Sequence, residues 1–587
     1  MRRRAIFARL ASGRLDWLWL SAAVLCLFLF KSASLPLMDP DESRCALVVK
    51  EMLQGGDWLM PHLTGQVYYD KPAPFFWLAA ASQKLTGSAE LGGRLVSALA
   101  AWLAVLITWS WARRLAGRAA GLTAGAALAT AGEFLFVAHW YRMDMAFTAA
   151  MWAALWWLAR GQAAAAEDPS AKARRAGWIG FYGFAALAVL FKGPAGLALP
   201  LLVILVWMIA RRQYSRLTGA LSPLGLALFA AIAAPWYVAA MWRDPSYFQY
   251  FFIRNNLERF ATVSVGRHWP GILYVPLLLG GLMPWTLLLP GVIVRSIRRG
   301  GLAVSQRGQV LLLWLAVLLP LGVVAVSSGK EAQYLMPLFA PLAVLIGVFL
   351  GNWSDSAQPH RLMRLGLPAL AISAVGVAAL PMILAPWSKE LSPWMAIAPA
   401  AVGILALAAL RLMRKEGRPA ALAMVVAAVF VGWLGAIGWV APTYRMASCR
   451  ELADQTKAAV PVKPARYFLW SAERFSFQFY TGWPSPIRFE DRMPDKLVRW
   501  LWKEGEAYGI ISGLDRVSLL DTLKGIQMET LATKGPTKSQ LVVVRITLTQ
   551  DPADWIRSNY GKAEQAGLSR DEIGAFESAR LSRPDGL

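Results

Sequence analysis

Residues 332–350 read AQYLMPLFAPLAVLIGVFL, a run of 19 residues without a charged side chain. A helix that crosses the hydrocarbon core of a bilayer needs about 20 mostly apolar residues, so this run predicts a membrane span. Similar segments recur along the chain and bring the predicted number of spans to about thirteen. The other twelve lie near residues 15–34, 91–112, 119–138, 143–160, 177–191, 194–210, 219–241, 270–294, 308–326, 362–384, 392–410 and 419–441. The expected fold class is an all-α polytopic membrane protein.

The composition of the whole chain agrees with this prediction. Its 587 residues are 57% hydrophobic and only 16% charged, whereas soluble proteins carry about 25% charged residues. So much apolar surface also argues against a disordered chain, and three cysteines are too few for a disulfide scaffold. An ordinary soluble enzyme is therefore not expected.

The positive charges gather on one side of the predicted membrane. The N-terminus and every second loop after it carry a net charge of +20, the opposite loops carry +1, and the tail from about residue 444 carries +3. Together these values account for the whole net charge of +24. An excess of Lys and Arg on the cytoplasmic side is the general pattern of membrane proteins. The N-terminus is therefore predicted to be cytoplasmic and the tail to lie outside, and no nucleic-acid partner is needed to explain the charge.

Three connections between or after the spans are informative. Two short spans meet at Phe191-Lys192-Gly193-Pro194, where the proline predicts a break because it cannot continue a helix. Two outer loops are long, at about 35–90 and 242–269. We expect a transmembrane domain over 1–443 that includes both loops, and a small α/β domain over 444–587 outside the membrane. The tail has strand patterns at 465–470 and 540–546 and helical patterns at 497–502 and 571–579.

Charged and aromatic side chains gather at the outer ends of several predicted spans. Each group alone has a structural explanation, such as a helix-capping carboxylate at Asp144 or a snorkelling side chain at Lys192. Charges so close to apolar spans are costly unless they are paired or hydrated, so a cluster of them indicates a site. Cations that bind phosphate, together with carboxylates, suit an anionic, lipid-linked substrate. The groups lie at Met38–Arg44, Tyr68–Pro74, Trp140–Asp144, Lys192, Arg254–Phe260 and Ser327–Tyr334.

Motifs of soluble metal sites, covalent nucleophiles and phosphate-binding loops do not occur in the chain. Its four histidines are scattered, and a divalent metal that bridges Asp70, His62 or His268 remains open. Cys45 and Cys449 would both lie in an oxidising compartment, so a disulfide between them is a second open point.

The run Asp39-Pro40-Asp41-Glu42-Ser43-Arg44, followed by Gly56-Asp57-Trp58 and Tyr69-Asp70-Lys71-Pro72, resembles the first periplasmic loop of the bacterial ArnT family. These proteins are lipid A aminoarabinose transferases, related to the protein O-mannosyltransferases, with the GT-C membrane fold. The likeness covers roughly residues 15–350, and the rest of the chain matches in architecture only. It continues at Tyr141-Arg142-Met143-Asp144, Lys192-Gly193-Pro194-Ala195-Gly196, Pro235-Trp236-Tyr237, Glu258-Arg259-Phe260, Pro284-Trp285 and Lys330-Glu331-Ala332-Gln333-Tyr334.

The resemblance implies two functional carboxylates. Asp41 matches the loop carboxylate that is regarded as catalytic in this superfamily, and Asp144 matches a second one at the start of the fourth span. Arg44 is expected to orient Asp41 through an ion pair.

The resemblance also implies a phosphate site. Lys71 and Arg259 match positions that hold the phosphate of the lipid carrier, with Tyr69 and Tyr334 beside them. One departure concerns the residues before Arg259: relatives often have an acidic residue and a histidine there, whereas this chain has Asn255 and Asn256. A metal site built on that histidine is less expected here.

The implied activity is that of an inner-membrane glycosyltransferase. It would transfer 4-amino-4-deoxy-L-arabinose from undecaprenyl phosphate to lipid A phosphates on the periplasmic side, among membrane lipids and without nucleic acid. The close alternative keeps the donor type but changes the sugar or acceptor, to galacturonic acid, mannose, a protein side chain or another glycan. A lipid or solute transporter is the alternative from a different class, but transporters gather their polar residues near mid-membrane.

Overall fold

The computed structural model describes most of the chain. The described residues are 15–167, 171–214, 218–262, 269–298, 304–354, 366, 368–379, 394–414, 418–439, 441–470, 474–489, 497, 500–501, 506–512, 526–535 and 540–549. By their contacts the residues form two compact units. Unit 1 contains Met1–Ser34, Met52–Pro61 and Val67–Ala441, and unit 2 contains Leu35–Glu51, His62–Gln66 and Pro442–Leu587.

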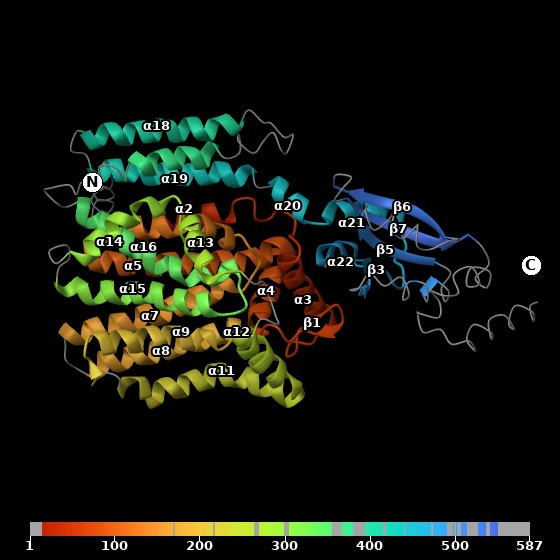
Figure 1. Ribbon diagram of the computed structural model, residues 1–587, viewed down its shortest axis with the longest axis horizontal. Coiled ribbons are helices and arrows are strands. Elements are labelled where there is room, and N and C mark those ends of the chain that lie inside the picture. The colour runs from red at the N-terminus through yellow and green to blue at the C-terminus, as the bar shows by residue number, and fades with distance from the viewer. Residues whose placement is uncertain are drawn as a thin grey trace, which may run out of the picture. The chain divides into compact units, whose positions relative to one another are not determined.

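Helices dominate unit 1, and Figure 1 shows many of them running alongside one another. The first half of the chain has α2 (Asp16–Leu29), α3 (Asp41–Gly55), β1 (His62–Leu63), β2 (Gln66–Val67), α4 (Pro74–Thr86), α5 (Ala89–Ala129), α6 (Gly132–Ala138), α7 (Asp144–Glu167), α8 (Ala171–Lys192), α9 (Ala195–Ala210), η1 (Thr218–Leu221), α11 (Pro223–Arg243) and the π-helix η2 (Phe248–Glu258). It continues with α12 (Arg259–Ala261), η3 (Gly271–Leu273), α13 (Tyr274–Gly281), η4 (Trp285–Leu288), α14 (Leu289–Ile297), α15 (Val304–Val326), η5 (Ala332–Leu335), α16 (Met336–Ser354), α18 (Trp394–Arg414) and α19 (Arg418–Trp439).

Unit 1 is a multi-pass membrane bundle. Within the described residues, five helices are long and apolar enough to cross a membrane, and a bent pair makes a sixth. The five are Ala89–Ala129, Pro223–Arg243, Gln306–Val326, Ala332–Asn352 and Pro419–Ile437. The count of thirteen spans stays a prediction. Of the predicted span near 362–384, the structure describes residues 366 and 368–379, and Pro368–Ala379 is a shorter apolar helix.

Two predicted helix breaks are confirmed. The long element α5 leaves helical geometry at Ala116 and Gly117, between the predicted spans 91–112 and 119–138. The element α8 ends at Lys192 and α9 begins at Ala195. Gly193 between them has a φ of +107°, which an L-residue with a side chain rarely adopts, and Pro194 opens the next helix.

One predicted span was wrong as a single helix. Residues 270–294 do not form one rod, because Gly271–Gly281 and Trp285–Ile297 bend by 98°. Pro284 lies at the bend, and proline has no amide hydrogen with which to continue the helical bonds. The carbonyl of Met283 instead accepts from the Gly132 amide at 3.0 Å. Hydropathy depends only on the composition of such a segment, so it does not predict where the helix bends.

Unit 2 contains a five-stranded sheet (Figure 1). Its strand order is β4-β3-β5-β7-β6, with β3 parallel to both β4 and β5, and β7 antiparallel to β5 and β6. The bounds are α20 (Ala441–Ala447), α21 (Arg450–Ala459), β3 (Phe468–Trp470), α22 (Phe475–Thr481), β4 (Ile487–Phe489), β5 (Glu506–Ser512), β6 (Ile526–Lys534) and β7 (Leu541–Leu548). The strand patterns predicted at 465–470 and 540–546 fall on β3 and β7.

The sheet buries apolar residues on both of its faces. On β7, Val542, Val544 and Ile546 point to one core cluster, and Val543 points to the other, as the alternation of strand side chains requires. The second cluster includes residues of α21 and α22. Of the two helical patterns predicted in the tail, only Leu497, Trp500 and Leu501 belong to the described residues, and 571–579 lies outside them.

Candidate active site

The central feature of unit 1 is the buried carboxylate of Asp144, the first residue of α7. Its side chain is only 1% exposed. One carboxylate oxygen accepts a hydrogen bond from Lys192 Nζ at the end of α8, and the other lies 3.1 Å from Arg142 Nε. A buried carboxylate is stable only when opposite charges compensate it, and here two cations do so.

Neighbouring elements hold these cations in place. The Arg142 carbonyl accepts from Ser97 Oγ of α5 at 3.0 Å, which ties the turn before α7 to that helix. With its amide oxygen turned toward Arg142, Gln333 accepts from both terminal nitrogens at 3.2 and 3.3 Å. The Lys192 ammonium lies 4.9 Å from the ring centroid of Tyr334. Four segments that are far apart in sequence thus meet around Asp144.

Lys71 joins the same electrostatic cluster. Its pKa is lowered to about 8, chiefly by burial; Asp70 opposes this shift, and the positive charges of Lys192, Arg259 and Arg142 add to it. Four cations therefore lie close enough together for their charges to interact. Such a place attracts an anion.

Arg259 and Glu331 form the other side of the cluster. Arg259 Nη2 lies 3.8 Å from Glu331 Oε1, and its Nη1 donates to Asn255 Oδ1 at 3.4 Å. Asn255 in turn donates to the Asp70 carbonyl at 2.9 Å, beside Lys71. The loop before η5 packs so closely here that a Cβ on Gly329 would come within 2.9 Å of the Arg259 side chain, so this position requires glycine.

We call the group Lys71, Arg142, Lys192, Arg259, Asp70, Asp144 and Glu331 the cation cluster. It contains four positive and three negative side chains, so one positive charge is in excess. Charge-assisted hydrogen bonds from lysine and arginine are the common means of binding phosphate. The cluster can therefore bind a singly charged phosphate ester.

The two predicted tyrosines lie differently. Tyr334 packs its ring against Lys192 in the cation cluster. Tyr69 donates its hydroxyl to Asp244 Oδ2 at 2.5 Å, and its ring lies 5.3 Å from that of Tyr250. Tyr250 donates to Asp70 at 3.1 Å. Tyr69 thus orders the chain next to Lys71 and connects the first outer loop with the second.

Asp41 and Arg44 belong to unit 2, whereas the other predicted site residues belong to unit 1. Asp41 is the first residue of α3, and its side chain is partly buried. Arg44 lies one turn later, and its guanidinium carbon is 5.3 Å from the centroid of the Phe475 ring on α22. The expected ion pair between Arg44 and Asp41 stays a prediction.

No group of three or more His, Cys, Asp and Glu side chains that could hold a metal occurs within the part of the chain that the structure describes. His62 belongs to unit 2 and Asp70 to unit 1, and His268 lies outside the described residues. A divalent metal that bridges Asp70, His62 or His268 stays a prediction. Cys45 and Cys449 are both buried, and the structure has no disulfide between them.

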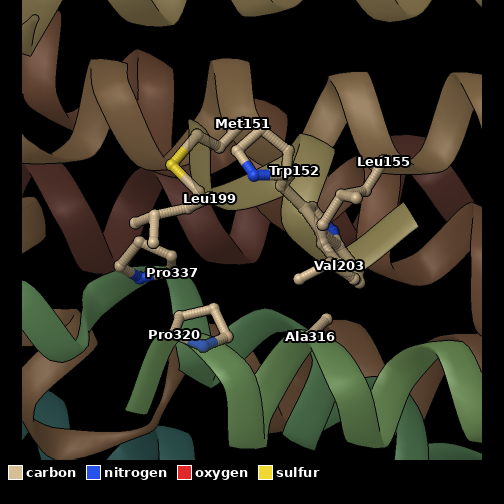
Figure 2. A pocket seen from close by; sticks show the side chains of 9 residues that line it. Met151, Trp152, Leu155, Leu199, Val203, Ala316, Pro320 and Pro337 are labelled. Carbon is tan, nitrogen blue, oxygen red and sulfur yellow. The ribbon is translucent and has the colours of Figure 1, made fainter. Parts of the chain in front are cut away.

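An apolar pocket lies between helices that lead away from the cation cluster (Figure 2). Its free volume is small, about 10 Å³, which is roughly the space of one water molecule. Met151 follows Asp144 on α7, Leu199 follows Lys192 across the short break into α9, and Pro337 follows Tyr334 into α16. The other lining residues are Trp152, Leu155, Pro200, Val203, Ala316 and Pro320. The pocket is therefore a small apolar gap between packed helices.

Sequence reasoning assigned no role to three members of the cation cluster, Arg142, Lys192 and Glu331. Arg142 was noted only as part of a motif, although its position two residues before Asp144 was a signal. Lys192 was explained by snorkelling, and a single cation at the end of an apolar helix gives no indication of its partner 48 residues away. Lys330, by contrast, donates to the carbonyls of Ala325 and Ser327 at the end of α15, which is the role of a helix C-terminal cation.

The chain is similar to known membrane glycosyltransferases. The model of the family "Dolichyl-phosphate-mannose-protein mannosyltransferase" matches residues 70–238. An undecaprenyl phosphate-alpha-4-amino-4-deoxy-L-arabinose arabinosyl transferase of Edwardsiella ictaluri is 33% identical over 376 residues, 63% of this chain and 66% of that protein. One from Pseudomonas aeruginosa (strain UCBPP-PA14) is 32% identical over 378 residues, 62% of this chain and 66% of that protein. The chain spans 55% to 66% of the length of the first curated relatives that it matches.

The fold is also found among solved structures. ArnT from Cupriavidus metallidurans bound to undecaprenyl phosphate matches with a TM-score of 0.75 and 24% identity, over 90% of this chain and 98% of that one. The apo form of the same protein matches with a TM-score of 0.72 and 25% identity over the same shares. The resemblance predicted from the first outer loop is therefore confirmed, and the chain is a homologue of the ArnT-like aminoarabinose transferases with the membrane fold of ArnT.

Proposed function

We propose that this protein is a polyprenyl-phosphate-dependent glycosyltransferase of the bacterial inner membrane. It transfers 4-amino-4-deoxy-L-arabinose from undecaprenyl phosphate to the phosphates of lipid A on the periplasmic side. The observation that carries the proposal is the cation cluster, in which Lys71 and Arg259 belong to an excess of buried positive charge. The names of the curated relatives support the sugar and its carrier.

The cation cluster suits the leaving group of this reaction. When the bond between the sugar carbon and the carrier phosphate breaks, the electron pair goes to the phosphate oxygen and the negative charge on the phosphate grows. Lys71 and Arg259 stabilise that charge, and cations fixed before the reaction do so without reorganisation. The phosphate leaves as an anion, so no general acid is required.

The acceptor decides what Asp41 does. A lipid A phosphate oxygen is nucleophilic without losing a proton, so Asp41 then orients the acceptor or stabilises positive charge that develops on the sugar. If the acceptor is a hydroxyl group, Asp41 takes its proton as a general base. Neither route requires a nucleotide.

In this proposal the isoprenoid chain of the carrier lies against the apolar surfaces of the membrane helices. Burying its carbons contributes about 25 cal/mol for each Å² of apolar surface. The arrangement of charges supports the orientation, with a cytoplasmic N-terminus and the long loops and tail in the periplasm.

The decisive experiment is a mass spectrum of lipid A from a host that lacks its own aminoarabinose transferase but still makes the donor. With this gene, lipid A is expected to gain the mass of one aminopentose on its phosphates. The same host with an empty vector is the control. No gain, with the protein folded in the membrane, contradicts the proposed sugar or acceptor. Mannose is then tested next, because the matching family model names a mannosyltransferase.

Lys71 gives a prediction about pH. A lysine is a cation only below its pKa, which here is about 8 instead of the usual 10.5 or so. We therefore expect donor affinity, measured with the phosphodiester donor, to fall as the pH rises through about 8. Lys71→Ala weakens donor binding roughly tenfold or more at pH 7, since hydrogen bonds to charged groups contribute about 1.5–3 kcal/mol.

Lys71→Arg is the matched control, because arginine stays charged throughout this range. Its donor affinity is expected to be independent of pH between 7 and 9.5. An equal pH dependence in the arginine variant would assign the titration to another group, and unchanged affinity in Lys71→Ala would remove Lys71 from the phosphate site.

A further inference from the structure

The first outer loop and the tail share a buried carboxylate within unit 2. Asp39 Oδ1 accepts from Ser43 Oγ at 2.5 Å and from the Ser476 amide at 2.8 Å. Its Oδ2 accepts from Ser476 Oγ. One carboxylate thus receives two hydrogen bonds from the start of α22 and one from the first turn of α3. Ser476 lies 437 residues after Asp39, so this contact is long-range.

Other contacts join the same two segments. The Asp39 amide donates to the Ala447 carbonyl at 2.9 Å, and the Leu37 amide donates to the Tyr480 hydroxyl at 2.9 Å. Further along α3, Lys50 Nζ donates to the Phe479 carbonyl at 2.8 Å. The segment from Leu37 to Lys50 is therefore attached to α22 at both of its ends.

The start of α3 is also ordered by bonds of its own. Glu42 Oε2 accepts from the Met38 amide at 3.0 Å, and the amides of Ser43 and Arg44 donate to the carbonyls of Met38 and Pro40, each at 3.1 Å. Asp41 lies in the middle of this turn, between the residues that form these bonds. Its position therefore depends on where Asp39 is held.

Asp39 is a buried carboxyl group with several hydrogen bonds. Burial raises its pKa, and the hydrogen bonds of Ser43 and Ser476 and the positive charge of Arg474 offset only part of that rise. A polar group that is costly to bury is retained where its hydrogen bonds are satisfied. The bonds from Ser43 and Ser476 fix the carboxyl group between α3 and α22, which suits a positioning role.

We propose that Asp39 and Ser476 are positioning residues for Asp41. Ser476 holds the Asp39 carboxylate, Asp39 holds the first turn of α3, and that turn sets the place of the Asp41 carboxylate. The C-terminal segment then forms part of the catalytic apparatus through α22. This inference rests on the proposed function, in which Asp41 touches the reacting groups.

The test compares Ser476→Ala with a control on the same helix. Thr481 also has a buried hydroxyl on α22, but its bonds are local: it donates to the Phe477 carbonyl at 2.8 Å and accepts from the Trp483 amide at 3.2 Å. Thr481→Val therefore removes a buried hydroxyl without touching the bonds to Asp39. For Ser476→Ala we expect kcat to fall by tenfold or more, with the donor KM within twofold of wild-type. For Thr481→Val we expect kcat within twofold of wild-type and a similar melting temperature in detergent.

Three further variants sharpen the result. Asp39→Asn is expected to lose a similar factor in kcat, and the double variant with Ser476→Ala should lose little more than either single variant, because both break one connection. Ser476→Thr keeps the hydroxyl and is expected to restore most of the rate. A wild-type kcat in Ser476→Ala, an equal loss in Thr481→Val, or fully multiplied losses in the double variant would each overturn the proposal.

A readout without activity separates this inference from the proposed function. Amide hydrogen exchange of residues 41–45 is expected to become faster in Ser476→Ala and to stay unchanged in Thr481→Val. If the wild-type protein transfers no sugar at all, the proposed function fails, but this exchange still reports whether Ser476 holds the turn. Unchanged exchange in Ser476→Ala would refute the positioning role whatever the activity is.

Discussion

Asp41→Asn is expected to abolish sugar transfer while the protein still inserts in the membrane and binds the donor. Asparagine has nearly the same shape as aspartate, so α3 and its contacts remain, and only the negative charge is lost. Removing a general base or a group that stabilises transition-state charge typically lowers kcat by about 10²–10⁴-fold. We expect a loss of about 10³-fold, or roughly 4 kcal/mol in activation free energy. The measurement is turnover with purified protein, donor and lipid A.

The control for this variant is Asp454→Asn. Asp454 is an exposed carboxylate on α21 in the same unit, paired with Lys457 at 3.1 Å, and exposed pairs contribute about 0–1 kcal/mol. It should turn over like wild-type and melt at a similar temperature. Wild-type turnover in Asp41→Asn would refute the assigned role, and loss of donor binding in that variant would indicate a structural role instead.

The sequence alone predicts the role of Asp41 but not that of Asp39. Asp41 lies in a run of charged residues that resembles a family motif, and its place at the start of a helix follows from the residues around it. The hydrogen bonds that join Asp39 to Ser476 could not be predicted. The two residues are separated by the whole membrane part of the chain, and no linear pattern pairs a loop aspartate with a particular serine of the tail.

For the membrane helices too, the sequence predicts local structure but not the contacts between distant segments. Hydropathy predicts them well because a bilayer imposes a length and a composition on each span, and the break at Gly193 follows from backbone chemistry. The bend at Pro284 was missed although the proline was visible, because prolines also occur inside membrane helices such as α15, at Pro320, and α16, at Pro341. Only the packing around each proline decides whether the helix continues.

Within the cation cluster, the sequence predicted several of the site residues but not which of them form pairs. Lys71, Arg259 and Asp144 were expected from the resemblance, and their charges do interact. The pairing of Asp144 with Lys192 was not predicted, because an isolated lysine at a helix end has a sufficient explanation in snorkelling. The structure rules out snorkelling, because the Lys192 side chain is only 14% exposed and does not reach into water.

Asp144→Asn is expected to cost both stability and activity. Its carboxylate compensates Lys192 and Arg142 in a place where the side chain is 1% exposed. Removing one partner of a buried ion pair costs about 3–5 kcal/mol because it leaves an uncompensated charge. In this cluster the variant leaves four cations facing two carboxylates. We expect a lower melting temperature in detergent and a loss of transfer of about 10²-fold or more, as for other electrostatic groups in active sites.

The double variant Asp144→Asn/Lys192→Met separates the two costs. Methionine fills a similar volume without charge, so the double variant removes the pair together, and replacing both members of a buried pair is often neutral for stability. We expect the melting temperature to return close to that of wild-type while transfer stays lost, because the reaction requires the charge of Asp144 and not only a balanced cluster. Recovery of transfer together with stability would reduce Asp144 to a counter-charge for Lys192. Failure to recover stability would mean that Arg142 is the cation that Asp144 chiefly compensates.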